Sequence, residues 1–342
     1  MTGSPEQRGN AHTNSTAPDE VQRLGQRRAD ARAAKDFAAA DALRDEIAEL
    51  GWAVTDAPGG FTLEPGDAGE PAPVASAASD VPSALDREPI YDVAIHWVCE
   101  GWSDDIDRAI AAFSSNAGSR KLQFVVADVT GDAADRWVGR DDVEVVWLRA
   151  DTGWAAARNA GLSRSLAPIV VAVDGSIEPT GDVFSPVETA LKDPAAGVVG
   201  PFGIVTHDLR EFEEAADEGP CDAVEGYLMA FRREVFTDVG GFDEKFRWYR
   251  TADIDWSFRV REAGLGCSVV PLPVVKHEHR AWAAATESQR TSWSKRNFYR
   301  FLDRYRDRWD LVLSGEPEDH DHDDDHEHEH RHERPVTMPE GR

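Results

Sequence analysis

Two aspartates lie close together at the start of one predicted helix. Asp253 and Asp255 stand in "ADIDWSFRVREAG" (252–264), and Arg259 follows Asp255 at a spacing of four residues. A carboxylate beside a reacting hydroxyl can take its proton as a general base. Acids in a first helical turn also simply favour the positive end of the helix dipole. The four-residue spacing predicts an ion pair between Asp255 and Arg259 on one side of the helix.

Further candidate ligands follow apolar runs elsewhere in the chain. Asp174 ends "PIVVAVD" (168–174), and His277 and His279 follow "VPLPVVK". Carboxylate oxygens suit Mg²⁺ or Mn²⁺, and imidazole is a common metal ligand. A pair of surface histidines in a loop is the competing interpretation. The pattern raises the hypothesis of a divalent-metal site without fixing its geometry.

The elements around these residues alternate short apolar runs with amphipathic segments. The runs at 91–98, 122–129, 143–150 and 168–176 predict strands, and the segments at 105–116 and 153–165 predict helices. This alternation is typical of an α/β fold with a mostly parallel sheet, in which ligands bind beyond the carboxyl ends of the strands. Glu100, Asp128 and Asp174 each follow a predicted strand at the position where that rule expects polar groups.

Composition excludes several classes of partner. The 342 residues carry a formal net charge of −27, with 41% hydrophobic residues and a pI of about 4.7. Such a chain repels nucleic acid and anionic membranes. The three cysteines, without a CxxC pair, favour neither a disulfide framework nor a thiolate zinc site. Neither a membrane-spanning run nor a signal peptide is recognised, so we expect a cytoplasmic protein.

The pattern divides the chain into six parts. These are a disordered segment (1–18), a small helical module (19–63), a Pro/Ala/Ser-rich linker (64–89), an α/β domain (90–283), a C-terminal amphipathic helix (284–313) and a disordered tail rich in His and acidic residues (314–342). The tail could bind zinc or nickel loosely, but a solvated tail is the favoured interpretation.

The C-terminal helix interleaves aromatic and basic residues in "SWSKRNFYRFLDRYRDRW" (292–309). That pattern occurs in nucleic-acid-binding helices, but packing of the aromatic face on the core is the favoured interpretation. Peripheral contact with a membrane surface is a third possibility.

The order of several motifs resembles one enzyme family. "RNAG" (158–161), "FRREVFTDVGGFDE" (231–244), "ADIDWSFRVREAG" and a late histidine occur in that order. Residues 90–283 resemble the inverting glycosyltransferases of family 2, which have the GT-A fold with a Rossmann-like mixed sheet. The resemblance implies a hexosyltransferase-type enzyme that takes a nucleotide-sugar donor, a hydroxyl acceptor and Mn²⁺ or Mg²⁺ on the diphosphate.

The resemblance also implies roles for individual residues. Asp253 would be the general base, and His279 is the alternative to His277 in the metal shell. The full assignment is Asp253, Asp255 and Arg259 for catalysis; Asp128, Arg158, Asn159 and Asp174 for the donor; and Asp174 and His277 for the metal. A helix-surface role for Arg158 and a loop role for Asp128 remain open alternatives.

Two positions depart from the family pattern. Ser176 stands where the D-x-D motif has its second acid, and Ala252 stands where an acid pair begins. Glu178 is a nearby carboxylate but not a favoured substitute. These departures support an alternative function, a catalytically degenerate glycosyltransferase-like domain that acts as a binding or scaffold protein.

The N-terminal segment resembles a different family. "ARAAKDFAAADALRDEIAELGWAVTDAPGGFTL" (31–63) resembles the small C-terminal helical module of bacterial cysteinyl-tRNA synthetases. We expect two short helices joined near Lys35–Asp36 and, at 52–63, a small hairpin or an extended tail around "PGG". A docking or interaction role is favoured over direct tRNA binding, which is the third functional hypothesis.

Overall fold

The computed structural model describes most of the chain in two compact units. The described residues are 17–33, 39–40, 43–44, 46–47, 52–57, 60–65, 75, 77–131, 136–137, 140 and 142–315. The units divide between Pro73 and Val74. The expected disordered ends fall largely outside these residues, as does the expected helix joint at Lys35–Asp36.

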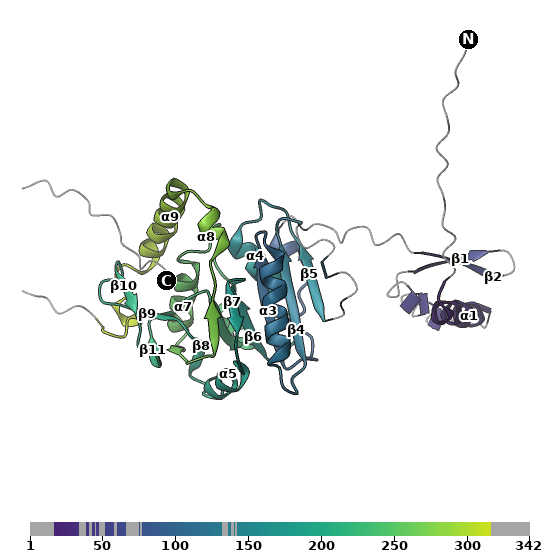
Figure 1. Ribbon diagram of the computed structural model, residues 1–342, viewed down its shortest axis with the longest axis horizontal. Helices are drawn as coiled ribbons and strands as arrows, with labels where there is room; N and C mark the ends of the chain where they lie inside the picture. The colour runs from purple at the N-terminus through teal and green to yellow at the C-terminus, as the bar shows by residue number, and fades with distance from the viewer. Residues whose placement is uncertain are drawn as a thin grey trace, which may run out of the picture. The chain divides into compact units, whose positions relative to one another are not determined.

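The N-terminal unit combines a helix with a hairpin (Figure 1). Helix α1 (Asp19–Ala33) accompanies strands β1 (Trp52–Ala57) and β2 (Gly60–Pro65), which pair antiparallel. The predicted hairpin is therefore present. Its core consists of the buried side chains of Ala17, Val21, Leu24, Leu43 and Ile47.

The second unit is built on an eight-stranded mixed sheet (Figure 1). Its strands are β3 (Val93–Cys99), β4 (Leu122–Asp128), β5 (Val143–Trp147), β6 (Ile169–Val173), β8 (Ala196–Gly200), β11 (Gly219–Cys221), β13 (Leu228–Arg232) and β14 (Gly266–Val269), in the order β11-β14-β8-β13-β6-β3-β4-β5. Strands β3, β4, β5 and β6 are parallel, whereas β13 runs antiparallel between β6 and β8. The parallel half brings the carboxyl ends of β3, β4 and β6 to one edge of the sheet.

Helices cover both faces of this sheet because successive strand residues point to opposite sides. One face packs against α3 (Ser103–Ser115) and α5 (Phe184–Ala190), and the other packs against α4 (Trp154–Leu162), α6 (Arg233–Val239) and α7 (Ala252–Glu262). In β3 the alternate residues Val93, Ile95 and Trp97 face α3 within the larger core. The predicted α/β class is confirmed.

Two small sheets and two further helices complete the unit. The elements are β7 (Ile177–Pro179) paired with β15 (Val274–Lys276), the sheet of β9 (Gly203–Thr206), β10 (Phe212–Glu214) and β12 (Ala223–Val224), the helices α8 (Arg280–Ala284) and α9 (Glu287–Tyr305), and the 3₁₀ turn η2 (Trp309–Leu311). The apolar face of α9, with Phe298, Phe301 and Tyr305, packs against β9, β10 and α7. These aromatic side chains are therefore packed on the core, as the favoured interpretation of the sequence pattern expected.

The second unit begins earlier than the predicted boundary at residue 90. Ala75 bridges to Leu148, and the 3₁₀ turn η1 (Ala78–Asp80) follows. Ala84 is fully buried and its N–H donates to Ser163 O at 2.7 Å. Part of the predicted linker at 64–89 is therefore packed on the α/β unit, because its small apolar side chains fill space beside α4.

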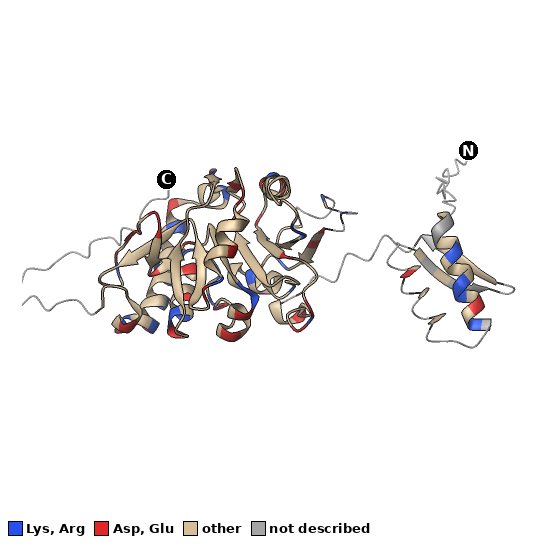
Figure 2. Ribbon diagram, turned by 90° about the horizontal axis from the view of Figure 1, so that it is seen from below, with Lys and Arg blue, Asp and Glu red and all other residues tan. Residues whose placement is uncertain are grey.

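Charged residues of both signs are interspersed over the helices and loops of this unit in the view of Figure 2. None of the helices in the described part of the chain combines the length and apolar character needed to cross a bilayer.

Candidate active site

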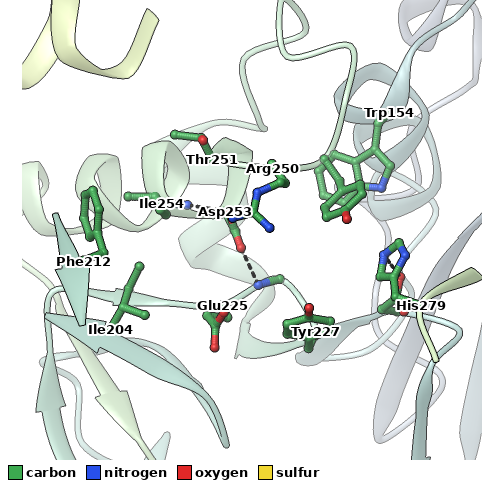
Figure 3. A pocket seen from close by; sticks show the side chains of 13 residues that line it. Trp154, Ile204, Phe212, Glu225, Tyr227, Arg250, Thr251, Asp253, Ile254 and His279 are labelled. Atoms are coloured by element: carbon green, nitrogen blue, oxygen red, sulfur yellow. Dashed lines mark hydrogen bonds and ion pairs between the residues drawn. The ribbon is translucent and has the colours of Figure 1, made fainter. Parts of the chain in front are cut away.

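One pocket brings together three candidate residues that lie far apart in the sequence, Asp174, Asp253 and His279. It is lined by Trp154, Asp174, Ile204, Phe212, Glu225, Gly226, Tyr227, Tyr249, Arg250, Thr251, Asp253, Ile254 and His279. Figure 3 shows Asp253 at its centre, with His279 and Trp154 on one side and Ile204 and Phe212 on the other. Asp174 and Asp253 therefore share one cavity, although Asp174 directly follows β6 and Asp253 lies in α7.

The start of α7 fixes the Asp253 carboxylate. Gly226 N–H donates to its Oδ2 at 2.7 Å and Ile254 N–H donates to Oδ1 at 3.0 Å. Thr251, the residue at the N-cap, has φ of 70°, a left-handed conformation that is strained for a β-branched side chain. Burial raises the pKa of Asp253, and the two backbone N–H groups and Arg250 only partly oppose this. A base with a raised pKa is better matched to proton transfer near neutral pH.

Asp174 is held as a carboxylate by three donors. Ser176 donates to its Oδ1 from the backbone N–H at 2.8 Å and from Oγ at 2.5 Å. His279 Nε2 lies 3.2 Å from Oδ2. Burial opposes ionisation of Asp174, but His279 and Ser176 outweigh it and lower the pKa to about 2. Ser176, which stands where the D-x-D motif has its second acid, thus donates hydrogen bonds to Asp174, the first acid of that motif.

His279, and not His277, stands beside Asp174. His279 caps α8, because its Nδ1 accepts the Trp282 N–H at 3.1 Å, and its ring stacks on Tyr249 at 4.5 Å. His277 Nε2 instead lies 2.7 Å from Glu178 Oε2 near the surface. The geometry therefore favours the alternative histidine over the one first assigned, because the backbone at the end of β15 turns the two side chains to different partners.

Arg158 lies beneath the pocket and not on its surface. It is 2% exposed, and its Nη1 donates to His96 O at 2.9 Å and to Val173 O at 3.3 Å. Burial lowers its pKa to about 10, against the opposing influence of Asp174 and Glu100. Arg158 is therefore not in the pocket lining, where the sequence predicted that it would contact a diphosphate. It is instead a buried positive charge behind Asp174.

Asn159 holds a loop. Its Nδ2 donates to Phe242 O at 2.8 Å, and its Oδ1 accepts the Phe242 N–H at 2.7 Å. Because both ends of the amide bind the "VGGFDE" backbone, the expected donor contact for Asn159 is corrected to a positioning role. An added Cβ on Gly241 would lie 2.5 Å from Asn159 Oδ1, so this close approach requires glycine.

Asp128 closes a turn at the end of β4. Its Oδ1 accepts from Thr130 N at 2.8 Å, Thr130 Oγ1 at 2.9 Å and Gly131 N at 3.1 Å. The carboxyl group is fully buried. Its position at the carboxyl edge of the sheet agrees with the sequence, and its contact with a donor remains a prediction.

The predicted ion pair between Asp255 and Arg259 is wrong. Arg304 Nη1 of α9 lies 2.9 Å from Asp255 Oδ1, and the aspartate side chain is 1% exposed. Arg259 donates to the carbonyls of Val239, at 2.7 Å, and Gly241 after α6. The packing of α9 against α7 thus supplies Arg304 as the counter-charge that the helix spacing assigned to Arg259. Asp255 and Arg259 both lie outside the pocket lining.

Sequence reasoning missed several pocket residues. Glu225 and Tyr227 lie in the turn before β13, and Tyr249 and Arg250 precede α7. Burial, with a smaller effect of Asp253, raises the pKa of Glu225 to about 7. The available signals were the polar "EGY" directly before an apolar strand and the aromatic and basic "RWYR" (247–250) before the acid pair.

The side chains present fit a cation shared with a substrate phosphate. Among the described residues, no group of three or more His, Cys, Asp or Glu side chains is arranged to hold a metal ion. Mg²⁺ is commonly held by one or two carboxylates together with substrate phosphates, so Asp174 is a sufficient anchor. With Nδ1 accepting from Trp282, neutral His279 carries its proton on Nε2, towards Asp174. Metal ligation by Nε2 therefore requires the other tautomer.

Comparisons with known proteins agree with both resemblances. Residues 206–295 match the model for glycosyltransferase like family 2, and residues 15–62 match the cysteinyl-tRNA ligase anticodon binding domain. The N-acetylglucosaminyl-diphospho-decaprenol L-rhamnosyltransferase of Mycobacterium tuberculosis is 26% identical over 202 residues, 55% of this chain and 63% of that protein. The cysteine–tRNA ligase of Opitutus terrae is 54% identical over 48 residues, 14% of this chain and 10% of the ligase. The chain thus spans less than two thirds of each relative.

The structure of GalNAc-T7 with UDP, GalNAc and Mn²⁺ shares the fold. Its TM-score is 0.50 at 14% sequence identity, and the match covers 62% of this chain and 48% of that one. The second unit therefore has the GT-A fold, an α/β architecture with a mixed central sheet. The family resemblances are likewise confirmed: the chain joins a segment similar to the cysteinyl-tRNA ligase anticodon binding domain to a segment similar to glycosyltransferase family 2.

Proposed function

We propose that the α/β unit transfers a sugar from a nucleotide diphosphate donor to a hydroxyl acceptor with inversion at the sugar carbon. The observation that carries the proposal is the shared pocket of Asp174, Asp253 and His279. The GT-A fold and the relatives that are named glycosyltransferases support it. An inverting transfer needs a base on one side of the sugar and a leaving diphosphate on the other, and a pocket with separated carboxylates suits that geometry.

In this mechanism Asp253 accepts the proton of the acceptor hydroxyl as the oxygen attacks the sugar carbon. The backbone N–H groups of Gly226 and Ile254 hold the carboxylate in place, so it needs little reorganisation during the reaction. Arg250, which lines the same pocket, adds positive charge beside the base.

At the other end of the pocket, Asp174 would anchor a divalent cation, Mn²⁺ or Mg²⁺, with His279 beside it. Bound there, such a cation would supply positive charge for the diphosphate. The buried Arg158 lies behind Asp174 and compensates part of its negative charge in the empty and the loaded site alike.

The test is incubation of the purified full-length protein with UDP- and GDP-sugars and Mn²⁺, with release of nucleoside diphosphate as the readout. We expect release from at least one donor and a loss of release with EDTA. Absence of donor hydrolysis, of transfer and of nucleotide binding would contradict the proposal.

One observation favours a second candidate, a binding or scaffold protein without turnover. Ser176 and His279 already occupy both oxygens of Asp174, and a serine replaces the second acid of D-x-D. Calorimetry with UDP and GDP, with and without Mn²⁺, separates the candidates when it is combined with turnover. Binding without turnover in the wild type supports the scaffold.

For the N-terminal unit we propose a docking role. It forms a compact unit of its own and resembles an anticodon-binding module, yet it belongs to a chain with net charge −27. A gel shift with tRNA that compares the full chain with a chain lacking residues 1–73 tests this. A shift that disappears on truncation would establish tRNA binding and contradict the docking role.

A further inference from the structure

Glu225 occupies a fixed position in the pocket. It lies between β12 and β13, its N–H donates to Phe202 O at 2.9 Å, and the next residue, Gly226, binds Asp253. The side chain lines the cavity beside Asp253 (Figure 3).

No hydrogen bond or ion pair within the described residues engages the Glu225 carboxylate. The charged groups that face it are Asp253 of α7, Arg250 before α7, Lys276 of β15 and Glu214 of β10. Lys276 attracts the Glu225 carboxylate but does not pair with it, since its Nζ lies over the Tyr227 ring, 3.6 Å from the ring centre. A half-buried acid that faces a pocket without a protein partner can accept hydrogen bonds from the hydroxyl groups of a ligand in place of water.

The wall beyond Asp253 is apolar. Ile204 of β9, Phe212 of β10 and Ile254 of α7 line the pocket, on the side of Asp253 away from His279 (Figure 3). The α9 helix supports this wall from behind, because Phe301 packs against Phe212 with ring centres 5.9 Å apart. The half of the cavity away from Asp174 therefore offers two carboxylates next to a rigid hydrocarbon surface.

We propose that Glu225 binds the acceptor, holding a second hydroxyl of the acceptor ring next to the hydroxyl that Asp253 deprotonates, and that the acceptor carries an apolar substituent against Ile204 and Phe212. The acceptor class is thus an amphipathic glycoside, a polyhydroxylated ring with a hydrocarbon substituent. This inference rests on the proposed function, because it assigns the acceptor side of the same site.

The chemistry follows from the two carboxylates. A ring with neighbouring hydroxyls can donate one hydrogen bond to each of them, which satisfies Glu225 and aligns the reacting oxygen on Asp253. A hydrogen bond to a charged group contributes about 10-fold or more in affinity. Transfer of the hydrocarbon substituent from water to the apolar wall contributes further binding free energy.

The experiment measures binding to the full-length protein by quenching of tryptophan fluorescence. The probes are octyl β-D-glucoside, octyl β-D-galactoside and octyl α-D-mannoside below their micellar concentrations, with the methyl glycosides of the same sugars for comparison. Glu225→Gln keeps the size of the side chain, and Glu214→Gln, an exposed neighbour outside the pocket lining, is the matched control. Thermal melting shows that each variant is folded.

We expect the wild type to bind at least one octyl glycoside more tightly than its methyl counterpart. Glu225→Gln should raise that Kd about 10-fold or more, whereas Glu214→Gln should leave it within about twofold. Binding of no octyl glycoside, equal binding of octyl and methyl forms, or an unchanged Kd in Glu225→Gln would each overturn the proposal. UDP and GDP titrations of the same samples report separately on the proposed function, so its failure is distinguishable.

Discussion

The backbone N–H of Gly226 donates to Asp253 Oδ2 at 2.7 Å, which joins the turn before β13 to the first turn of α7. The two residues come from separate parts of the fold, and this contact sets where the proposed base points. The strained backbone of Thr251 lies one residue before α7, so the position of Asp253 depends on the surrounding packing and not on local helix preference.

Substitution of Gly226 should therefore impair turnover without unfolding the protein. A Cβ at this position would lie 3.2 Å from Asp253 Oδ2 and 3.3 Å from Asp253 Cβ, so the carboxylate must shift by a few tenths of an ångström. We expect Gly226→Ala to lower kcat about 10-fold, since small displacements of a base are costly. Gly266→Ala, whose Cβ would meet only Ala195 O at 3.5 Å, is the control. Equal kcat in both variants contradicts the positioning role.

The pH dependence of turnover should reflect the raised pKa of Asp253. Burial disfavours its charged form, so the base is lost as pH falls through a value above the usual 3.8. We expect the acid limb of kcat/KM to have its midpoint above 3.8 and to disappear in Asp253→Asn, where the residual rate no longer depends on this group. A midpoint at or below the ordinary value would show that Asp253 is not the titrating base.

The two histidines should differ in their effect on nucleotide binding. His279 lies 3.2 Å from Asp174, whereas His277 pairs with Glu178 at 2.7 Å. With Mn²⁺ present, we expect His279→Ala to weaken UDP or GDP binding about 10- to 100-fold, and His277→Ala to change it less than about twofold. Isothermal calorimetry checks this. The reverse order would restore His277 as the residue beside the diphosphate.

The buried pair of Asp255 and Arg304 should contribute to stability in a pH-dependent way. Arg304→Met leaves the carboxylate without its counter-charge and should lower the free energy of unfolding by about 2 kcal/mol at neutral pH, a value reduced because Arg304 is 39% exposed. Burial raises the pKa of Asp255 to about 6, although Arg304 opposes this. The native state thus binds the proton more readily than the unfolded chain does.

The loss should consequently shrink as pH falls towards about 6 and be small below it, because protonated Asp255 needs no counter-charge. Urea unfolding at neutral pH and below that pKa measures the difference. Arg306→Met, which breaks the exposed pair with Asp303, is the control and should cost little at either pH. An equal loss at both pH values would mean that packing of the Arg304 chain, and not its charge, stabilises α9.

The sequence predicted the features that follow from local pattern. Apolar runs that end in acids located β4 and β6. Because parallel strands bring their carboxyl ends to one edge of the sheet, the same pattern also placed Asp128 and Asp174 at that edge. Family resemblance then singled out Asp253 among the acids of α7. Asp174 and Asp253, two of the site residues named from the sequence, both line the pocket.

What the sequence missed depends on tertiary packing. The choice between His277 and His279 is set by the pairing of β15 with β7, which no local pattern records. Arg259 has the right spacing for Asp255, yet Arg304 reaches it from a helix far along the chain. Glu225 gave no periodic signal, since a lone acid in a turn is usually solvated.

The central claim is that one pocket joins a donor-binding carboxylate to a separate base, and the Asp253→Asn variant tests it most directly. Turnover of a nucleotide sugar and the Kd for its nucleoside diphosphate should be measured side by side in this variant and the wild type. We predict a Kd within about twofold of the wild type and a fall in kcat of about 10³-fold. Equal turnover in the two proteins, or a wild type that neither binds nor turns over any donor, would contradict the account.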